Sequence, residues 1–340
     1  MHGTLRPSSV GHGEDGGAIV KAAVLHALGQ SPRYEDFPEP RADPGEVVVA
    51  VKAASLKNID KMLARGSHYD RHAALPCVCG VDGVGLLPDG SRVYCGGARP
   101  PYGMMAERAV VSKGWCLPVP DVVDDATAAA LPNPALSSWL ALEWRARLQP
   151  GESVLVLGAT GVAGQLAIQV ARHLEAGRVV AAGRNRRVLA RLADLGADAT
   201  IALDVADREL TAALVQELRK GPFDVILDYL WGRPTELLLE ALTGHDIKAA
   251  ASRVRLVEIG EMAGPKIALP AAALRSSGVE LLGSGGGSVS PEAIFATFPK
   301  MWELASRGRL RIQVEPVPLS EVEGAWGRRD LAGSRLVLVP

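Results

Sequence analysis

The sequence has few cysteines, no excess of either charge and no long apolar run. Its four cysteines include no close Cys-x-x-Cys pair, so we interpret them as free thiols rather than a disulfide framework. The formal net charge of -1 argues against binding to nucleic acid or to an anionic membrane. No apolar run is long enough to span a bilayer, and the N-terminus lacks a signal-peptide pattern. We therefore expect a globular, cytoplasmic protein.

Composition and periodicity divide the 340 residues into unequal parts. Residues 1–19 are rich in glycine, serine and histidine, so we expect a mobile N-terminal extension. Residues 20–136 contain short apolar runs between turns rich in proline and glycine, which predicts a β-rich domain. The predicted strands of this domain cover residues 21–26, 46–54, 92–95 and 108–111.

From residue 137 to residue 285, apolar runs alternate with helical segments. This alternation is typical of a doubly wound parallel sheet. The predicted strands of this block cover residues 154–157, 179–183, 200–203, 225–229, 255–259 and 280–282. Residues 286–340, with a helix near 291–307 and a strand at 335–339, are expected to return the chain to the first domain.

A glycine-rich turn follows the first strand of the parallel block. Apolar residues after the turn recur at the spacing of one helical face. Such a turn can serve helix packing alone, but a strand before it and a helix and strand after it favour a site for a dinucleotide pyrophosphate. Glycines there let the backbone approach the phosphates. The candidate cofactor-binding residues of the turn are Gly158, Thr160, Gly161, Val162 and Gly164.

The residues after the second predicted strand distinguish the two nicotinamide cofactors. NAD requires a carboxylate there for its ribose 2′-OH, whereas the 2′-phosphate of NADP requires cations. This sequence has Arg184, Asn185, Arg186 and Arg187, with no carboxylate. A solvated basic loop is the alternative, but arginines at a helix start oppose the helix dipole unless an anion binds. We predict NADP(H), with Arg184, Asn185 and Arg187 as candidate ligands.

Several segments, taken in their order and spacing, resemble the medium-chain dehydrogenase/reductase superfamily, in its zinc-free quinone oxidoreductase branch. The resemblance extends from about residue 20 to residue 340. It includes Asn58-Ile59-Asp60 followed by Arg65-Gly66, the glycine-rich turn, and the segments 21–24, 80–85, 103–107, 128–132 and 224–228.

This resemblance implies an α/β fold in which a Rossmann doubly wound parallel sheet is inserted in a GroES-like, β-rich catalytic domain. It assigns residues 20–136 and 286–340 to the GroES-like domain and residues 137–285 to the NADP-binding domain. It also implies a homodimer, and it places Tyr69, Gly260 and Ser284 near the nicotinamide or the substrate pocket.

Zinc enzymes of this superfamily hold their catalytic ion with Cys, His and Cys. At the corresponding places this sequence has Lys57, Val81 and Asn133, which cannot supply that set of thiolates and imidazole. A zinc site made from His72, Cys77 and Cys79 is an alternative with unmatched spacing. We predict a metal-free enzyme.

The resemblance places Lys57 and Asn133 beside the nicotinamide. We predict that the Lys57 ammonium, with Asn133, donates hydrogen bonds to the substrate's carbonyl oxygen, and Tyr69 completes the candidate catalytic set. An ion pair between Lys57 and Asp60 or Asp82 is the alternative for this lysine.

These features favour NADPH-dependent reduction of quinones or α,β-unsaturated carbonyls, which needs little acid or base chemistry from the protein. One alternative is a carbonyl reductase or alcohol dehydrogenase for simple ketones or aldehydes. Another is an NADPH-binding protein without turnover, since fold alone does not establish catalysis. The sequence indicates a small-molecule substrate and no nucleic-acid or membrane partner.

Overall fold

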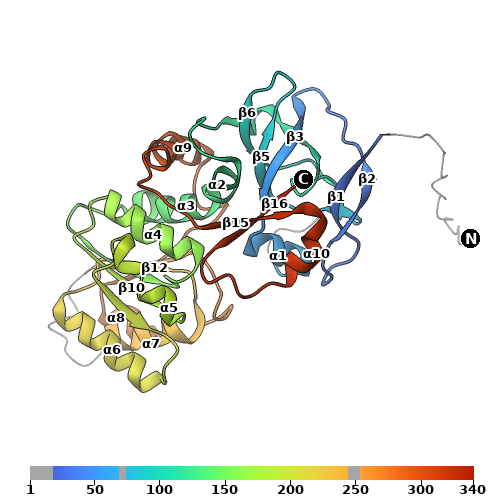
Figure 1. Ribbon diagram of the computed structural model, residues 1–340. Helices are drawn as coiled ribbons and strands as arrows, with labels where there is room; N and C mark the ends of the chain where they lie inside the picture. The colour runs from blue at the N-terminus through green and yellow to red at the C-terminus, as the bar shows by residue number, and fades with distance from the viewer. Residues whose placement is uncertain (1–17, 69–73, 244–252) are drawn as a thin grey trace, which may run out of the picture.

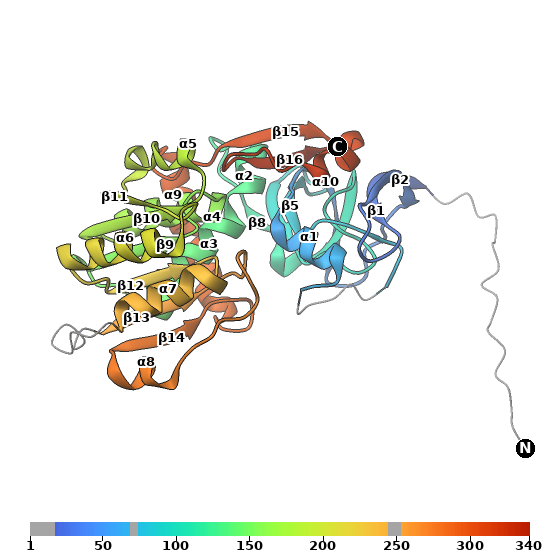
Figure 2. The same cartoon turned by 90° about the horizontal axis from the view of Figure 1, so that it is seen from below.

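The structure, a computed structural model, describes residues 18–68, 74–243 and 253–340. Residues 1–17, which make up most of the predicted N-terminal extension, lie outside this range. Tyr69 and His72 lie outside it as well. The chain forms two lobes that lie side by side in both views (Figures 1 and 2). No helix in the described part of the chain is both long and apolar enough to cross a membrane.

The first lobe contains two mainly antiparallel sheets. The smaller has the order β2-β1-β4, and the larger has the order β15-β16-β3-β5-β6-β8, with β7 also paired to β3. The strands are β1 (Ile19–Leu25), β2 (Arg33–Pro38), β3 (Glu46–Ser55), β4 (Cys77–Val78), β5 (Asp82–Leu86), β6 (Arg92–Gly96), β7 (Arg108–Ser112), β8 (Leu117–Pro118), β15 (Val314–Pro318) and β16 (Arg335–Val339). The helices of this lobe are α1 (Asn58–Arg65), α2 (Asp125–Ala130) and α10 (Val322–Gly327).

The second lobe is built on a six-stranded sheet of order β11-β10-β9-β12-β13-β14. All its neighbouring strands are parallel. The strands are β9 (Ser153–Leu157), β10 (Arg178–Gly183), β11 (Ala199–Ala202), β12 (Val225–Asp228), β13 (Val254–Glu258) and β14 (Val279–Gly283). The helices are α3 (Pro132–Trp139), α4 (Val162–His173), α5 (Arg186–Leu189), α6 (Asp207–Lys220), α7 (Gly232–Leu242), α8 (Ala271–Ser276) and α9 (Pro291–Ser306), and the π-helical segment η2 (Leu140–Ala146) follows α3.

The parallel strands lie where the apolar runs predicted them, and the predicted fold class is confirmed. The chain leaves β9 first toward β10 and β11 and later toward β12, β13 and β14. The carboxyl ends of β9 and β12 therefore border the crevice at which doubly wound sheets bind ligands.

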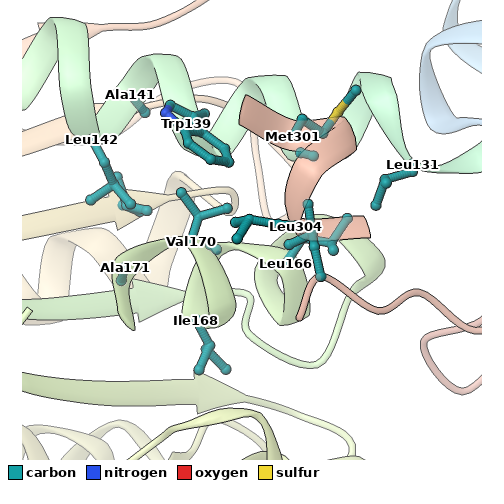
Figure 3. Close-up of a cluster of buried hydrophobic side chains, with 14 of the residues drawn as sticks. Leu131, Trp139, Ala141, Leu142, Leu166, Ile168, Val170, Ala171, Met301 and Leu304 are labelled. Atoms are coloured by element: carbon teal, nitrogen blue, oxygen red, sulfur yellow. The ribbon is translucent and has the colours of Figure 1, made fainter. Parts of the chain in front are cut away.

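The largest hydrophobic core holds the two lobes together. Figure 3 shows Trp139 and Leu166 packed near Met301 and Leu304, from α3, α4 and α9. Trp139 and Met301 are both completely buried. The same cluster continues into the first lobe through Ala53, Val84 and Tyr94. Because this core crosses from one lobe to the other, it fixes the walls of the crevice between them.

Candidate active site

The glycine-rich turn connects β9 to α4 with the geometry expected of a dinucleotide site. Gly158 has a φ of +91°, a conformation that side chains rarely adopt. Gly161 is the N-cap residue of α4, and its N–H donates to the Gly158 carbonyl at 3.0 Å. The first N–H groups of a helix have no partner within that helix. The start of α4 therefore presents free donors suited to an anion.

The three glycines of the turn differ in what surrounds them. A Cβ on Gly164 would lie 2.4 Å from the Gly158 oxygen and 2.5 Å from the Ala159 Cα, so Gly164 lets α4 pack on the turn. A Cβ on Gly161 would meet only the Gly158 oxygen, at 3.4 Å. Protein atoms leave the space beside Gly161 open, which is the arrangement that close approach of a phosphate requires.

The basic segment after β10 contains one arginine at the crevice and others directed elsewhere. Arg184 lines the crevice, and no ion pair joins it to any residue that the structure describes. Arg186 forms an ion pair with Asp204 at 2.7 Å. The Asn185 side chain caps α5 by accepting from the Arg187 and Val188 N–H groups. Arg184 is therefore the cation best placed for a phosphate.

The crevice between the lobes is a cavity of about 1340 Å³. It is lined by the turn, by Arg184 and Asn185, and by segments of the first lobe. Of the predicted site residues, it brings together Lys57, Asn133, Gly158, Thr160, Gly161, Val162, Gly164, Arg184, Asn185, Gly260 and Ser284. Arg187 is exposed on α5 and is not among the described lining residues. Tyr69 lies outside the described range, so its predicted role stays a prediction.

Lys57 belongs to a buried cluster of charges in the wall of this cavity. Its Nζ donates to Asp82 Oδ1 at 2.7 Å, to the Ser55 carbonyl at 2.9 Å and to Ser55 Oγ at 3.0 Å. Asp60 lies 3.8 Å from the same Nζ and accepts from the Lys57 and Val81 N–H groups. Burial raises the pKa of Asp60, although the Lys57 charge opposes this.

This geometry changes the interpretation of Lys57. Its ammonium has three N–H donors, and all three are used within the protein. Its side chain is only 1% exposed, so no proton is left to donate to a substrate oxygen in this arrangement. The observed contacts of Lys57 are those of an ion pair with Asp82. They do not match the prediction that its ammonium donates to the substrate. Asn133 lines the same cavity.

Several residues that line the cavity are not recognised in the sequence. Gly183 ends β10, and a Cβ there would lie 2.4 Å from Thr160 Cγ2. The segment 331–335 reaches the turn from the far end of the chain, where Gln165 Nε2 donates to the Gly333 carbonyl at 3.1 Å. Tyr94 and Tyr229 are buried tyrosines of the wall. The packing of Gly183 against Thr160 of the turn, and the return of the C-terminal segment, leave no local signal in the sequence.

The cysteines do not assemble a site. All four are free thiols, and burial raises the pKa of Cys77 to about 11, which disfavours the thiolate that a metal would need. Within residues 18–68, 74–243 and 253–340, no three His, Cys, Asp or Glu side chains are placed to hold a metal ion. His72, the third member of the alternative zinc set, lies outside these residues.

Comparisons with known proteins agree with the fold. Residues 162–307 match the family described as zinc-binding dehydrogenase; the places of the three superfamily zinc ligands, residues 57, 81 and 133, precede this match. A probable NADPH-dependent quinone reductase from Emericella nidulans is 26% identical over 91% of this chain and 96% of its own.

Solved structures are similar over nearly the whole chain. The quinone oxidoreductase from Thermus thermophilus, whose structure includes a complex with NADPH, is 30% identical, with a TM-score of 0.78 over 94% of this chain and 100% of that one. A probable oxidoreductase from Mycobacterium abscessus is 26% identical, with a TM-score of 0.79 over 95% of this chain and 99% of that one. The chain belongs to the medium-chain dehydrogenase/reductase superfamily, among its quinone-oxidoreductase-like members.

Proposed function

We propose that this protein is an NADPH-dependent oxidoreductase that reduces quinones or α,β-unsaturated carbonyl compounds without a metal. One observation carries the proposal. A single cavity joins a dinucleotide-type turn and an unpaired arginine in one lobe to apolar residues at the lobe junction, including Ile59, Leu136 and Leu140. A planar, weakly polar acceptor fits such a wall.

The residues of the turn and of the basic segment fit NADPH. The open space beside Gly161 and the free N–H groups at the start of α4 suit the pyrophosphate, and Arg184 suits the 2′-phosphate. We assign Gly158, Thr160, Val162, Gly164 and Asn185 to the same site, with Gly260 and Ser284 on the nicotinamide side. Bound NADPH supplies a hydride. The protein would hold the cofactor against the substrate and keep water away from the reacting carbon.

Replacing Arg184 with alanine is expected to weaken NADPH binding about tenfold to a hundredfold and to leave NADH binding nearly unchanged. A charge-assisted arginine–phosphate contact is typically worth about 1.5 to 3 kcal/mol. The only carboxylates among the described lining residues are Glu258, which ends β13, and Glu261, which follows it. Strand β13 lies three strand positions from β10. Titration of both cofactors measures the effect.

Arg186→Ala is the matched control for this prediction. Its guanidinium is already paired with Asp204, so the variant should keep the selectivity of the original protein. Equal dissociation constants of the unmodified protein for NADH and NADPH, or retained selectivity in Arg184→Ala, would contradict the assignment.

The substrate class is tested by anaerobic oxidation of NADPH with quinones, enals, enones and simple ketones. Turnover of quinones or enones supports the proposal. Turnover of simple ketones alone indicates a carbonyl reductase, and tight binding of NADPH without oxidation indicates a binding protein. The buried charges of Lys57 and Asp82 neutralise each other and offer no strong acid for a simple ketone, which favours the activated acceptors.

We also propose a homodimer joined along β14. This strand is one of the two outer strands of its sheet, and an uncovered edge is a template for pairing. Leu281 on β14 and Leu274 on α8 are exposed apolar residues. Light scattering should find a dimer that Leu281→Arg converts to a monomer. Leu28→Arg, at an exposed site of the other lobe, should stay dimeric. A dimer that survives Leu281→Arg would place the interface elsewhere.

A cytoplasmic location is part of the same proposal. The four cysteines are free thiols, and reduced thiols persist in the reducing conditions of the cytosol. Fractionation of cells that express the full chain tests this proposal.

A further inference from the structure

A tyrosine hydroxyl, rather than Lys57, is placed to donate to the substrate. We propose that Tyr94 is a catalytic residue, whose hydroxyl donates a hydrogen bond to the carbonyl oxygen of the substrate while Asp82 and Lys57 position it. This inference rests on the proposed function, because it concerns the acceptor that the cavity holds. It names a residue for which neither the motifs nor the comparisons give a role.

Tyr94 is held rigidly in the wall of the cavity. It lies on β6, directly across from Val84 on β5, and is 6% exposed. Its ring packs against Phe298 of α9 with centroids 5.5 Å apart. Because α9 belongs to the core that joins the lobes, the position of the Tyr94 ring relative to the cofactor lobe is fixed. A donor fixed in this way loses little entropy when it meets a substrate.

The charge cluster orients the Tyr94 hydroxyl. Asp82 lies diagonally across the strand pair from Tyr94, near enough for its carboxylate to act on the phenol, and it accepts from Lys57 Nζ at 2.7 Å. Burial and Asp82 raise the pKa of Tyr94 well above its usual value, so the phenol keeps its proton. The Lys57 ammonium offsets the Asp82 charge, which would otherwise repel a negative oxygen placed nearby.

This arrangement favours a charged oxygen over a neutral one. A carboxylate is a stronger acceptor than a ketone oxygen, so the phenolic O–H is directed toward Asp82 when a neutral substrate binds. As hydride reaches the conjugated carbon, negative charge develops on the substrate oxygen, which then competes with Asp82 for the O–H. Rotation about the phenolic C–O bond transfers the hydrogen bond. A contact made mainly in the transition state raises kcat.

Other hydroxyls near this wall are less suited to the role. Ser137 Oγ donates to the Pro134 carbonyl at 2.8 Å. The Tyr229 hydroxyl lies against Ser137 and Ser138, but it is buried and makes no hydrogen bond of regular geometry to a described residue. Asn133 lines the cavity and can add a second, weaker donor from its amide.

Tyr94→Phe tests this assignment because it removes the hydroxyl and keeps the ring. We expect kcat for an enone to fall about a hundredfold, the scale on which oxyanion donors act, with NADPH affinity and melting temperature unchanged. Reduction of an electron-poor quinone should fall less. Tyr34→Phe, in β2 and outside the cavity, is the control and should match the original protein. Incorporation of 3-fluorotyrosine at position 94 restores a hydroxyl and should restore turnover.

A binding measurement makes the test independent of turnover. The anion of 4-nitrophenol resembles an enolate oxygen, and its binding to the NADP⁺-loaded protein can be followed by absorbance. Tyr94→Phe should weaken this binding at least tenfold.

Unchanged enone turnover and unchanged 4-nitrophenolate binding in a folded Tyr94→Phe would overturn the inference and leave the proposed function intact. If none of the acceptors supports oxidation of NADPH, the proposed function is wrong. The binding result would still decide the role of Tyr94. If Tyr94→Phe fails to fold, the fluorotyrosine protein decides, because unchanged binding despite its more acidic hydroxyl contradicts a hydrogen bond to the ligand.

Discussion

Gly161→Val is expected to weaken NADPH binding about a hundredfold or more while the melting temperature stays close to that of the original protein. The protein itself leaves room for the side chain, since a Cβ there would meet only the Gly158 oxygen at 3.4 Å. The valine would instead occupy the place where a phosphate meets the helix start, and each charge-assisted hydrogen bond to the phosphate that it breaks costs about 1.5 to 3 kcal/mol. Calorimetric titration with NADPH and thermal unfolding of the same sample measure both quantities.

Gly164→Ala should give the opposite pattern and serves as the control. Its Cβ would lie within 2.5 Å of backbone atoms of the turn, so the backbone of the turn or of α4 must move. Overpacking of this kind typically costs about 1 to 3 kcal/mol of stability. If Gly161→Val loses melting temperature as much as Gly164→Ala does, Gly161 serves packing rather than the cofactor.

Lys57→Met is expected to lower the free energy of unfolding by about 3 to 5 kcal/mol, the usual result of breaking a buried ion pair from one side. The variant leaves Asp82 without the partner that lies 2.7 Å away. It also removes the positive charge that opposes the effect of burial on Asp60. Denaturant unfolding of the cofactor-free protein measures this change separately from catalysis.

The double variant Lys57→Met, Asp82→Asn is the control for this interpretation. Removing the carboxylate charge as well should recover at least half of the stability that the single variant loses, because a neutral pair costs less to bury than a single charge. If Lys57→Met keeps its stability and its NADPH affinity but loses kcat, the ion-pair interpretation is wrong and the lysine acts on the substrate directly.

The parallel sheet could be predicted from the sequence because its strands are local and strongly patterned. The runs before Gly158 and before Arg184 end where β9 and β10 end. In each case an apolar run meets a turn residue, and burial on both faces makes the pattern continuous.

The strands that the sequence does not reveal have a different character. Strand β2 is largely polar and borders its sheet, so it carries little apolar pattern. Strand β15 contains Pro316 and Pro318, which is tolerated because β15 is also an edge strand. Strands β4 and β8 have two residues each, too few to show a period.

The sequence left two roles open for Lys57, a donor to the substrate and an ion pair with Asp60 or Asp82. Asp82 lies 25 residues away, at the start of β5, and the antiparallel pairing of β3 with β5 brings it close to Lys57, which lies just beyond the end of β3. Sequence position places both near the catalytic wall but does not say toward which group the ammonium points. The proposed role of Tyr94 could not be predicted for the same reason, because it depends on Asp82 of the neighbouring strand.

The place of β16 has a consequence for how the chain is made. This strand lies inside the larger sheet of the first lobe, between β15 and β3, and Leu338 pairs with Ala54. During synthesis the ribosome releases residues 46–96 long before it releases residues 335–339. The end of β3 at Ala54 and Ser55 therefore stays without its strand partner until the last residues are released, whereas residues 153–283 already contain every strand of the parallel sheet. Because exposed strand edges promote aggregation, the waiting first lobe, rather than the cofactor lobe, is where newly made chains should need chaperones.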